Sequence, residues 1–444
     1  MNLRRNINVQ AWEEHLFQRL RFVMLVVVFV VGCGGDNGAG QVTADPHRFD
    51  IVENQTSDFG MNTPGGRGGR IIRVTTLASS GPGSLRDALE ASGPRIVVFE
   101  VGGVIDLNKR QLAIREPFIT VAGQTAPSPG ITIIRGGLSI RSHDVIVKHL
   151  RVRPGDAGEA KRSGWEPDGI GTANEDAFNI VVDHCSISWA VDENLSASGA
   201  RTEGPEATSR RVTFSNCIIA EGLDDASHSK GPHSKGSLIH DFCREIAVIG
   251  NLYAHNVQRN PYFKAFTTGV IVNNVIYNPG SRAVQVNFSN SEWEGVDLIP
   301  QACRISVVGN VMIHGGDTRA GLAMVSTKGD VYLEDNIAMD QAGGAVAVSS
   351  IDVRILSEKP MWGNITPMPS STVVDHVAQH AGARPKDRDV VDERIIREFL
   401  AREGRVIDSQ EEVGGYPQVE IVRRPLNVPA NVDAWLAQLA AEIE

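Results

Sequence analysis

An asparagine recurs through the middle of the chain, each time directly after a short run rich in β-branched residues. The recurring positions are Asn216, Asn251, Asn274, Asn310 and Asn336, which are 35, 23, 36 and 26 residues apart. Such self-similarity indicates stacked supersecondary units. The shorter steps suit one turn of a β-solenoid, and the longer steps suit a turn that carries a projecting loop. Asparagine suits the bends because it tolerates left-handed backbone and bonds neighbouring main chain. Stacked asparagines can also bond one another along the axis.

A right-handed, single-stranded parallel β-helix is the all-β fold that fits this spacing best. A propeller would need near-constant repeats of about 40 residues, whereas these repeats are shorter and carry irregular insertions. Strand-like runs at residues 131–134 and 178–182 extend the same pattern towards the N-terminus. We therefore predict that residues 65–355 form one β-helical catalytic domain.

The two ends of this predicted solenoid differ from its middle. Ser84 is expected to N-cap a short helix that ends at Glu90 and covers the open end of the solenoid. After about residue 355 the asparagine pattern stops, and residues 392–400 and 432–443 show helical periodicity. Residues 356–444 are therefore predicted to be a helical and irregular tail that packs on the β-helix.

The N-terminal residues are expected to carry an export signal. An apolar run at residues 22–31 follows two arginines and has the length of a signal-peptide core, too short to span a bilayer. It ends in Val-Val-Gly-Cys33, which resembles the lipobox of bacterial lipoproteins. The sequence predicts a lipoprotein signal over residues 1–33 and a flexible tether over residues 34–64. The protein would then reach the membrane only through a lipid on Cys33, at the periplasmic or outer surface. A plain secretory signal is the alternative.

Composition limits the partners. The net charge of −10 argues against a nucleic-acid ligand, but a polyanionic substrate needs only a positive field in its own groove. The four cysteines after Cys33 fit no metal spacing and are expected to be buried small apolar residues. Cys185 and Cys217 occupy similar places in neighbouring repeats, and the sequence leaves their bridging open. We expect a monomer.

Three polar clusters lie in successive turns of the predicted solenoid, where stacking would bring them into one groove. Their residue types suit removal of the C5 proton of a uronate, which is α to a carboxylate. Asp and Glu are hard ligands for Ca²⁺, and Lys and Arg stabilise the enolate-like anion. Histidines at 228, 233 and 240 lie in polar loop sequence, and no zinc site is predicted there. The clusters are Glu166, Asp168, Asp192 and Glu193; Lys230 and Lys235; and Arg259 and Lys264.

Two motifs resemble those of the pectate lyase family. Residues 183–188 (D-H-C-S-I-S) are similar to one family signature, and residues 259–264 (R-N-P-Y-F-K) are similar to its R-x-P-x-x-R/K motif. Residues 65–340 follow the family's order of elements. The resemblance implies calcium-dependent β-elimination of de-esterified polygalacturonate, with 4,5-unsaturated oligogalacturonides as products.

The resemblance also implies roles for four cations. Arg259 matches the arginine proposed as the proton-abstracting base, and Lys264 matches a substrate-binding cation. Lys235 best matches the lysine that contacts the uronate carboxylate, although Lys230 lies in a near-copy of its context. An arginine base works only where its neutral form is favoured, so an alkaline optimum is expected.

Calcium ligands follow from the resemblance too. Asp168 resembles the family's calcium aspartate, and Glu166 stands where some members have another acid. Asp192 resembles the first acid of the second calcium segment. That segment usually has an aspartate four residues later, where this chain has Ser196, and Glu193 is the candidate for the missing oxygen.

Three other functions fit parts of the sequence. A β-helix lyase for another uronate, such as alginate, would use the same residue types. A glycoside hydrolase would need two carboxylates that flank the bond, and it would give no reason for the Arg–Lys cluster. A non-catalytic glycan-binding β-helix would keep the asparagine repeat but would not need Arg259 and Lys264 together.

Overall fold

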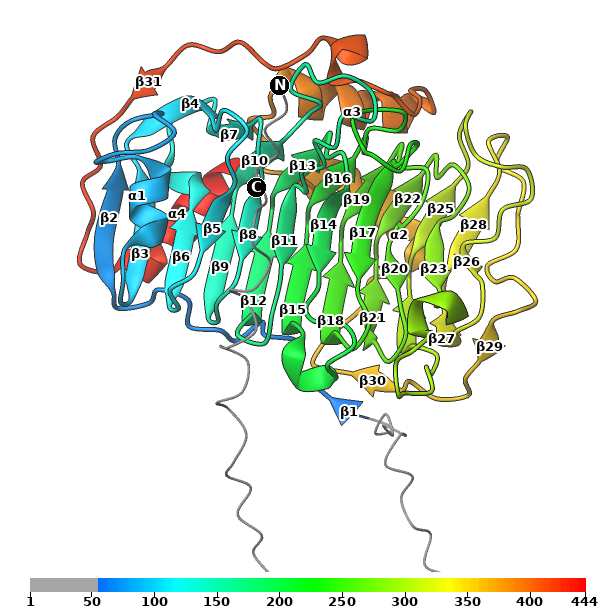
Figure 1. The fold of residues 1–444 in the computed structure, drawn as a ribbon. Helices are drawn as coiled ribbons and strands as arrows, with labels where there is room; N and C mark the ends of the chain where they lie inside the picture. Colours follow the sequence, from blue (N-terminus) through cyan, green and yellow to red (C-terminus); the bar gives the residue numbers. More distant parts are fainter. Residues whose placement is uncertain (1–54) are drawn as a thin grey trace, which may run out of the picture. The chain divides into compact units, whose positions relative to one another are not determined.

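The computed structural model describes residues 55–444, which form three long parallel sheets wound into a β-helix (Figure 1). Sheet 1 contains β2 (Arg70–Val74), β3 (Arg95–Phe99), β6 (Ile119–Ala122), β9 (Val145–Lys148), β12 (Phe178–Asp183), β15 (Arg210–Ser215), β18 (Arg244–Ile249), β21 (Thr268–Val272), β24 (Arg304–Val308), β27 (Asp330–Glu334) and β29 (Arg354–Ile355). Sheet 2 contains β4 (Val101–Asp106), β7 (Ile131–Ile134), β10 (Leu150–Arg153), β13 (Ser186–Ser188), β16 (Ile218–Ala220), β19 (Leu252–Ala254), β22 (Val275–Tyr277), β25 (Val311–Ile313), β28 (Ile337–Met339) and β31 (Val422–Arg423). Sheet 3 contains β5 (Leu112–Ile114), β8 (Leu138–Ile140), β11 (Ile170–Thr172), β14 (Glu193–Ala197), β17 (Lys235–Ile239), β20 (Tyr262–Phe263), β23 (Val284–Val286) and β26 (Val325–Ser326).

Each coil adds one strand to each sheet, so residues one coil apart in the sequence become neighbours in space. Sheet 1 pairs β12 with β15 and β15 with β18 in parallel register, with Ser215 opposite both Asp183 and Ile249. The inward side chains are aliphatic and form one continuous buried core between the sheets. The parallel β-helix predicted from the asparagine spacing is confirmed.

In six successive coils, from the β12–β13 turn to the β27–β28 turn, two residues with different roles link sheet 1 to sheet 2, whereas His149 alone links β9 to β10. The first residue has a positive φ. The residues in this position are His149, His184, Asn216, Gly250, Asn273, Gly309 and Asp335. Glycine and asparagine suit it because they adopt left-handed backbone at the lowest cost. The second residue points inward and stacks on its equivalent in the next coil.

The second position forms the predicted asparagine ladder. The Asn251 side chain donates to Asn274 Oδ1 at 2.9 Å, Asn274 donates to Asn310 at 2.9 Å, and Asn310 donates to Asn336 at 3.0 Å. The three donors are buried, so each bond satisfies amide groups that would otherwise lie unpaired in the core.

Asn216 is the exception, because it lies one residue too early for the ladder. Its φ of 51° places it in the first position of the turn, and Cys217 takes the ladder position, where its N–H donates to Asn251 Oδ1 at 2.8 Å. Cys185 stacks on Cys217 in turn, with 3.4 Å between its nitrogen and Sγ of Cys217. The four cysteines of the described chain are buried, as expected, and they are free, a point that the sequence left open.

Four helices and a few short elements complete the described chain. They are α1 (Leu85–Glu90), α2 (Ser370–His380), α3 (Val390–Ala401), α4 (Val432–Ile443), and a two-residue pair of β1 (Gln55–Thr56) with β30 (Met361–Trp362). Ser84 caps α1 as predicted, accepting from the N–H of Asp87. The predicted helical segments of the tail correspond to α3 and α4, whereas α2 was not predicted.

The tail runs back along the β-helix against the direction in which the coils stack. Helix α2 contacts β22 and β25 of the late coils, β31 pairs antiparallel with β4 of an early coil, and α4 contacts the short 3₁₀ helix η1 (Gly123–Thr125). Figure 1 shows this return path in orange and red. The apolar side chains of α2 and α3 pack on the outer face of sheet 2.

A buried ion network fixes α3 to the middle coils. Arg151 and Arg153 on β10 are fully buried on that face. Arg151 Nε lies 3.1 Å from Asp392, and Arg153 lies 2.7 Å from Asp392 and 2.5 Å from Asp389. Asp389 also caps α3. Asp392 thus links the tail helix to the solenoid.

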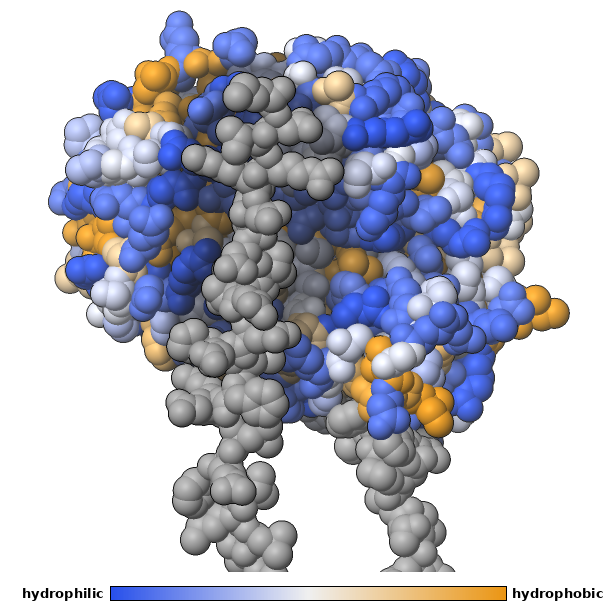
Figure 2. Space-filling model, in the orientation of Figure 1, coloured by the Kyte–Doolittle hydropathy of each residue, from blue (hydrophilic) through white to orange (hydrophobic). Residues whose placement is uncertain are grey.

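The predicted lipoprotein signal and most of the predicted tether lie outside the described residues. None of the helices within residues 55–444 combines the length and the apolarity needed to cross a membrane. The face shown in Figure 2 is mostly hydrophilic, with smaller apolar patches between the polar side chains.

Candidate active site

The predicted site residues gather where four consecutive strands of sheet 3 begin. Asp168 precedes β11, Asp192 precedes β14, Lys235 opens β17, and Arg259 precedes β20. The register places Glu193 beside Lys235, and Lys235 forms the next bridge to Gln258. Parallel stacking therefore brings into one row residues that lie 91 positions apart in the sequence, from 168 to 259.

Three carboxylates converge at one end of this row. Asp168, Asp192 and Glu193 each offer an oxygen, and these oxygens lie within 4.8 Å of one another. Desolvation and the charge of Asp192 raise the pKa of Asp168 to about 8, against the opposing charge of Arg259. Acidic groups this close together repel one another when ionised, and a positive charge between them would stabilise their ionised forms.

Ser196, which was not a predicted calcium ligand, and Glu166, which was, differ in how they lie relative to these three carboxylates. Gly171 has no side chain, and a Cβ there would be 3.0 Å from Ser196 Oγ and 3.5 Å from Asp168 Oδ2. The Ser196 hydroxyl therefore faces the same space as Asp168. Glu166 instead accepts a hydrogen bond of 2.7 Å from the backbone N–H of Ser229.

Two histidines lie against Asp192, and the sequence did not predict this contact. His233 Nε2 lies 2.9 Å from Asp192 Oδ1, and the ring of His228 stacks on His233 with 3.8 Å between centroids. Burial opposes ionisation of Asp192, but the hydrogen bond and charge of His233, with the charge of Arg259, lower its pKa overall. The only sequence signal for this role was the position of His233 inside the basic cluster.

Arg259, which comes from a later coil, lies over the acidic group. It forms an ion pair with Glu193, and its guanidinium lies 5.9 Å from the centre of the Tyr262 ring. Burial lowers the pKa of Arg259, whereas the charges of Asp192, Tyr262, Glu292 and Asp168 raise it. A cation bound among the carboxylates would offset part of the negative charge that raises the pKa of Arg259, and it would therefore favour the neutral guanidine.

The two candidate lysines of the basic cluster differ in position. Lys235 is buried beside Glu193, and its ammonium donates to Gln258 at 3.2 Å. Burial lowers the pKa of Lys235. Lys230 is exposed on the preceding loop. Only Lys235 therefore lies in the row that contains Arg259.

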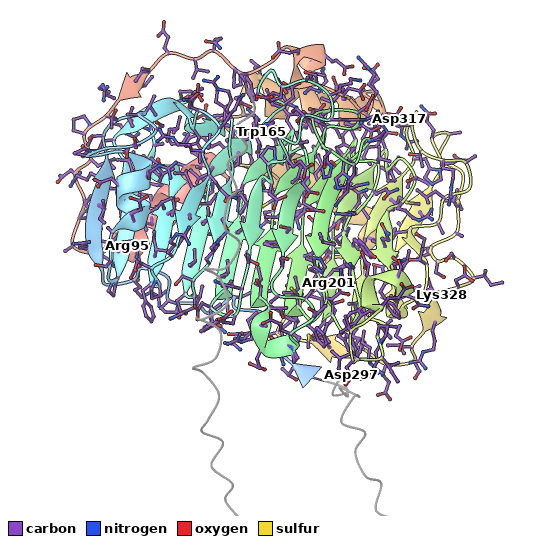
Figure 3. All side chains as sticks on the ribbon, viewed as in Figure 1. Arg95, Trp165, Arg201, Asp297, Asp317 and Lys328 are labelled. Carbon is purple, nitrogen blue, oxygen red and sulfur yellow. The ribbon has the colours of Figure 1, made fainter. Side chains whose placement is uncertain are left out.

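Lys264 lies at the far end of β20 and is already paired. Its ammonium is 2.6 Å from Glu292 and 3.3 Å from Asp241. Arg201 donates to the Glu292 carbonyl at 2.9 Å. Figure 3 shows Trp165, before β11, and Arg201, after β14, towards opposite ends of the sheet 3 strands. No sequence pattern indicated the Glu292 contact, because it depends on the path of a long loop.

The loop that carries Glu292 is held in place by its own small core. Trp293, in the 3₁₀ helix η3 (Asn290–Trp293), packs against Phe242 and Phe266 at ring distances of 5.9 and 5.5 Å. Trp293 is only 5% exposed. Glu292 is therefore fixed beside Lys264 by packing and not only by charge.

The donor set at the acidic end suits a hard divalent cation. Carboxylate and hydroxyl oxygens are the ligands that Ca²⁺ prefers, and the raised pKa of Asp168 reflects its burial and the neighbouring charge of Asp192. The residues present therefore fit calcium.

Comparison with known proteins identifies the family. No family model matches the sequence. The chain is 33% identical over 373 residues to a probable pectate lyase C of Aspergillus flavus, covering 80% of this chain and 79% of that protein. The chain belongs to the pectate lyase family. It is accordingly a polysaccharide lyase. A second relative, probable pectate lyase C of Emericella nidulans, is 32% identical over 401 residues, covering 85% of this chain and 84% of that protein.

A solved structure supports the fold independently. The crystal structure of Jun a 1, the major allergen from cedar pollen, matches with a TM-score of 0.50 and 16% identity, covering 73% of this chain and 92% of that chain. At this identity the match bears on the fold alone. The family resemblance predicted from residues 183–188 and 259–264 is confirmed by the relatives.

Proposed function

We propose that this pectate lyase cleaves de-esterified polygalacturonate by calcium-dependent β-elimination and releases 4,5-unsaturated oligogalacturonides. The observation that carries the proposal is the row formed by Asp168, Glu193, Lys235 and Arg259, in which anions for a metal and cations for a polyanion meet across adjacent coils. A hydrolase would use the carboxylates but would leave the cations without a task.

Each side chain has a distinct part in the proposed reaction. Asp168, Asp192, Glu193 and the Ser196 hydroxyl would hold Ca²⁺, with Glu166 at the edge. Calcium, when bound, supplies a Lewis-acid contact to the uronate carboxylate. In the first step Arg259 takes the C5 proton.

The remaining cations act on the substrate carboxylates. Lys235 stabilises the charge that develops next to C5. Lys264 binds a neighbouring uronate in competition with Glu292, and the exposed Lys230 contributes at most to the surrounding field. The electron pair left at C5 forms the C4–C5 double bond as the C4–O bond breaks, and the departing oxygen takes a proton from solvent to become a hydroxyl group.

The primary test follows product formation. Purified protein is mixed with polygalacturonate at alkaline pH, and the ultraviolet absorbance of the unsaturated uronide is recorded. A rise supports the proposal. New reducing ends without absorbance would indicate a hydrolase, and activity on alginate alone would move the substrate to another uronate.

Removing calcium is expected to abolish this absorbance rise, and added calcium to restore it. Asp168→Asn should reduce kcat/KM about 10²-fold and raise the calcium concentration needed for half-maximal rate, because one anionic ligand is lost. Asp225→Asn is the matched control, since Asp225 pairs with Lys161 at the surface. Full activity of wild-type protein in chelator would contradict the metal assignment.

Glu292→Gln is expected to lower KM for polygalacturonate about two- to fivefold, because the substrate no longer competes with a carboxylate for Lys264. Glu294→Gln removes the same charge from an exposed position two residues away and should change KM less. An unchanged or raised KM in Glu292→Gln would show that Lys264 does not bind the polymer.

We also propose that the protein is exported and anchored by a lipid on Cys33. The apolar run at residues 22–31 and the Val-Val-Gly-Cys ending support this. Labelling of cells with a radioactive fatty acid should mark the wild-type protein and not Cys33→Ser. Equal labelling of both, or release of both into the medium, would favour the plain secretory signal.

A further inference from the structure

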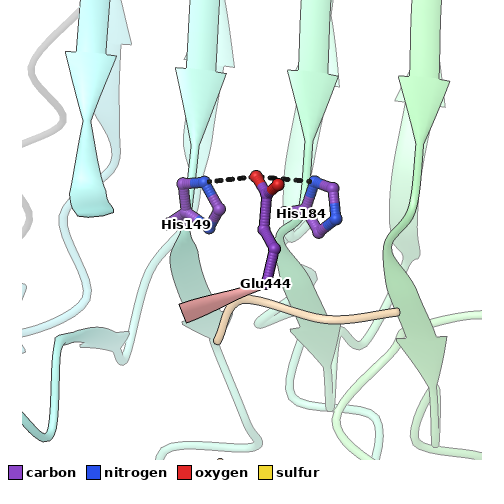
Figure 4. Close-up of side chains that lie close together, drawn as sticks. All are labelled: His149, His184 and Glu444. Atoms are coloured by element: carbon purple, nitrogen blue, oxygen red, sulfur yellow. Dashed lines mark ion pairs between the residues drawn. The ribbon is translucent and has the colours of Figure 1, made fainter. Parts of the chain in front are cut away.

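Two buried histidines and one carboxylate meet at the turns between sheet 1 and sheet 2, on the side away from the asparagine ladder. His149 and His184 occupy the first turn position in neighbouring coils, and their rings stack with 5.3 Å between centroids. Glu444, at the end of α4, places its carboxylate between them, 3.3 Å from His149 Nε2 and 3.6 Å from His184 Nδ1 (Figure 4). The three potential ligand atoms lie within 4.8 Å of one another.

The hydrogen bond on the other side of His149 defines which of its nitrogens is bare. His149 Nδ1 lies 2.8 Å from the carbonyl oxygen of Ala383. A carbonyl only accepts, so Nδ1 carries the proton. In the neutral ring the other nitrogen, Nε2, then carries the lone pair.

That lone pair faces an anion without a proton between them. His149 is fully buried, and its Nε2 has no hydrogen-bond partner among the described residues. Two electron-rich atoms at 3.3 Å repel each other unless a cation lies between them.

We propose that His149, His184 and Glu444 form a binding site for a divalent metal ion of the zinc class. Imidazole nitrogens suit zinc, and hard calcium prefers oxygen. Tetrahedral zinc with bonds of about 2.1 Å places its ligand atoms about 3.4 Å apart, which matches the separations of 3.3 and 3.6 Å. The backbone bond from His149 Nδ1 is the outer contact that orients a metal-binding histidine.

The second imidazole binds after a change of tautomer. His184 Nδ1 lies 3.0 Å from Asp183 Oδ2 and donates to it. Coordination through Nδ1 moves that proton to Nε2, with no net proton lost. Asp183 remains paired with Lys148, whose ammonium is 2.7 Å away.

An ion can reach this site from solvent. The Glu444 side chain is 29% exposed, and it lines a surface cavity of about 470 Å³ together with His380 and Lys386. Binding there would fasten α4 to the coils of β9 and β12. The site is separate from the carboxylates at the start of the sheet 3 strands, since none of its ligands belongs to that row.

Titration of the full chain with zinc tests the proposal without reference to lyase activity. Calorimetry is run in excess calcium, and the melting temperature is recorded with and without zinc. We expect the wild-type protein to bind one zinc ion per chain, and the Asp192→Asn variant to bind one as well. Zinc should also raise the melting temperature, whereas calcium alone should not. Glu444→Gln should weaken this binding at least 10-fold, whereas Glu442→Gln, an exposed neighbour on α4, should not.

His149→Gln provides the second variant, because it removes the lone pair that defines the site. It should lose the same zinc equivalent, provided that its circular dichroism matches the wild type; if it does not, Glu444→Gln alone decides. Absence of stoichiometric zinc binding in wild-type protein, or unchanged binding in Glu444→Gln, overturns the proposal.

Discussion

Replacing Arg259 by alanine is expected to reduce kcat on polygalacturonate by about 10²- to 10⁴-fold, the usual contribution of a positioned base. Arg259 reaches the carboxylate row from two coils further along the β-helix and pairs with Glu193. KM should change less than kcat, because Lys235 remains in place to hold a substrate carboxylate. Steady-state rates from ultraviolet absorbance, at several calcium concentrations, measure both constants.

The pH profile distinguishes a base from a residue that only holds Glu193. Since a base must be neutral, the wild-type rate should rise with pH into the alkaline range. Burial lowers the pKa of Arg259, and this shifts the expected rise towards pH values that can be measured. Arg259→Lys should move the rise to lower pH, because an amine loses its proton more readily than a guanidinium. A wild-type optimum below neutrality, or an Arg259→Ala variant with near-normal kcat, would contradict the assignment.

Replacing Asp392 by asparagine is expected to lower the free energy of unfolding by about 3–5 kcal/mol, the cost of breaking a buried ion pair from one side. Asp392 is fully buried and accepts from Arg151, Arg153 and Ser186. The asparagine keeps the shape of the side chain but removes the negative charge that neutralises two buried guanidinium groups. Guanidinium chloride denaturation followed by circular dichroism measures the loss.

A matched control for this variant is Glu393→Gln. Glu393 is exposed on the same helix, so its replacement should change the free energy of unfolding by no more than about 0.5 kcal/mol. If Asp392→Asn proved as stable as Glu393→Gln, the network would have to be stabilised mainly by Asp389. The Asp389→Asn variant would then show the larger loss.

The repeat could be predicted from the sequence because each coil carries the same local signal. A bend residue follows a β-branched run, and stacking then fixes which distant residues are neighbours. This is why the sequence alone predicts that Asp168 and Arg259 lie in one groove. Asn216 was misplaced by one residue because asparagine suits both turn positions, and only the strand register separates them.

Features that depend on long connections could not be predicted in this way. The contact of Glu292 with Lys264 depends on how a loop folds over its own aromatic core. Helix α2 begins with Ser370 and contains β-branched residues of modest helix propensity, and it is stabilised by burying Val373 and Val377 against sheet 2. The ligand set of His149, His184 and Glu444 likewise exists only because the tail returns to the early coils.

This returning tail has a consequence for how the chain acquires its structure during synthesis. A solenoid can add coils one at a time, since each contacts only its neighbours, but Arg151 precedes Asp392 by 241 residues. The guanidinium groups of β10 therefore emerge from the ribosome long before their counter-ions do. Coils stacked early would stay hydrated on that face until the tail packs on it, so the arrival of α3 would convert a stepwise assembly into one cooperative unit.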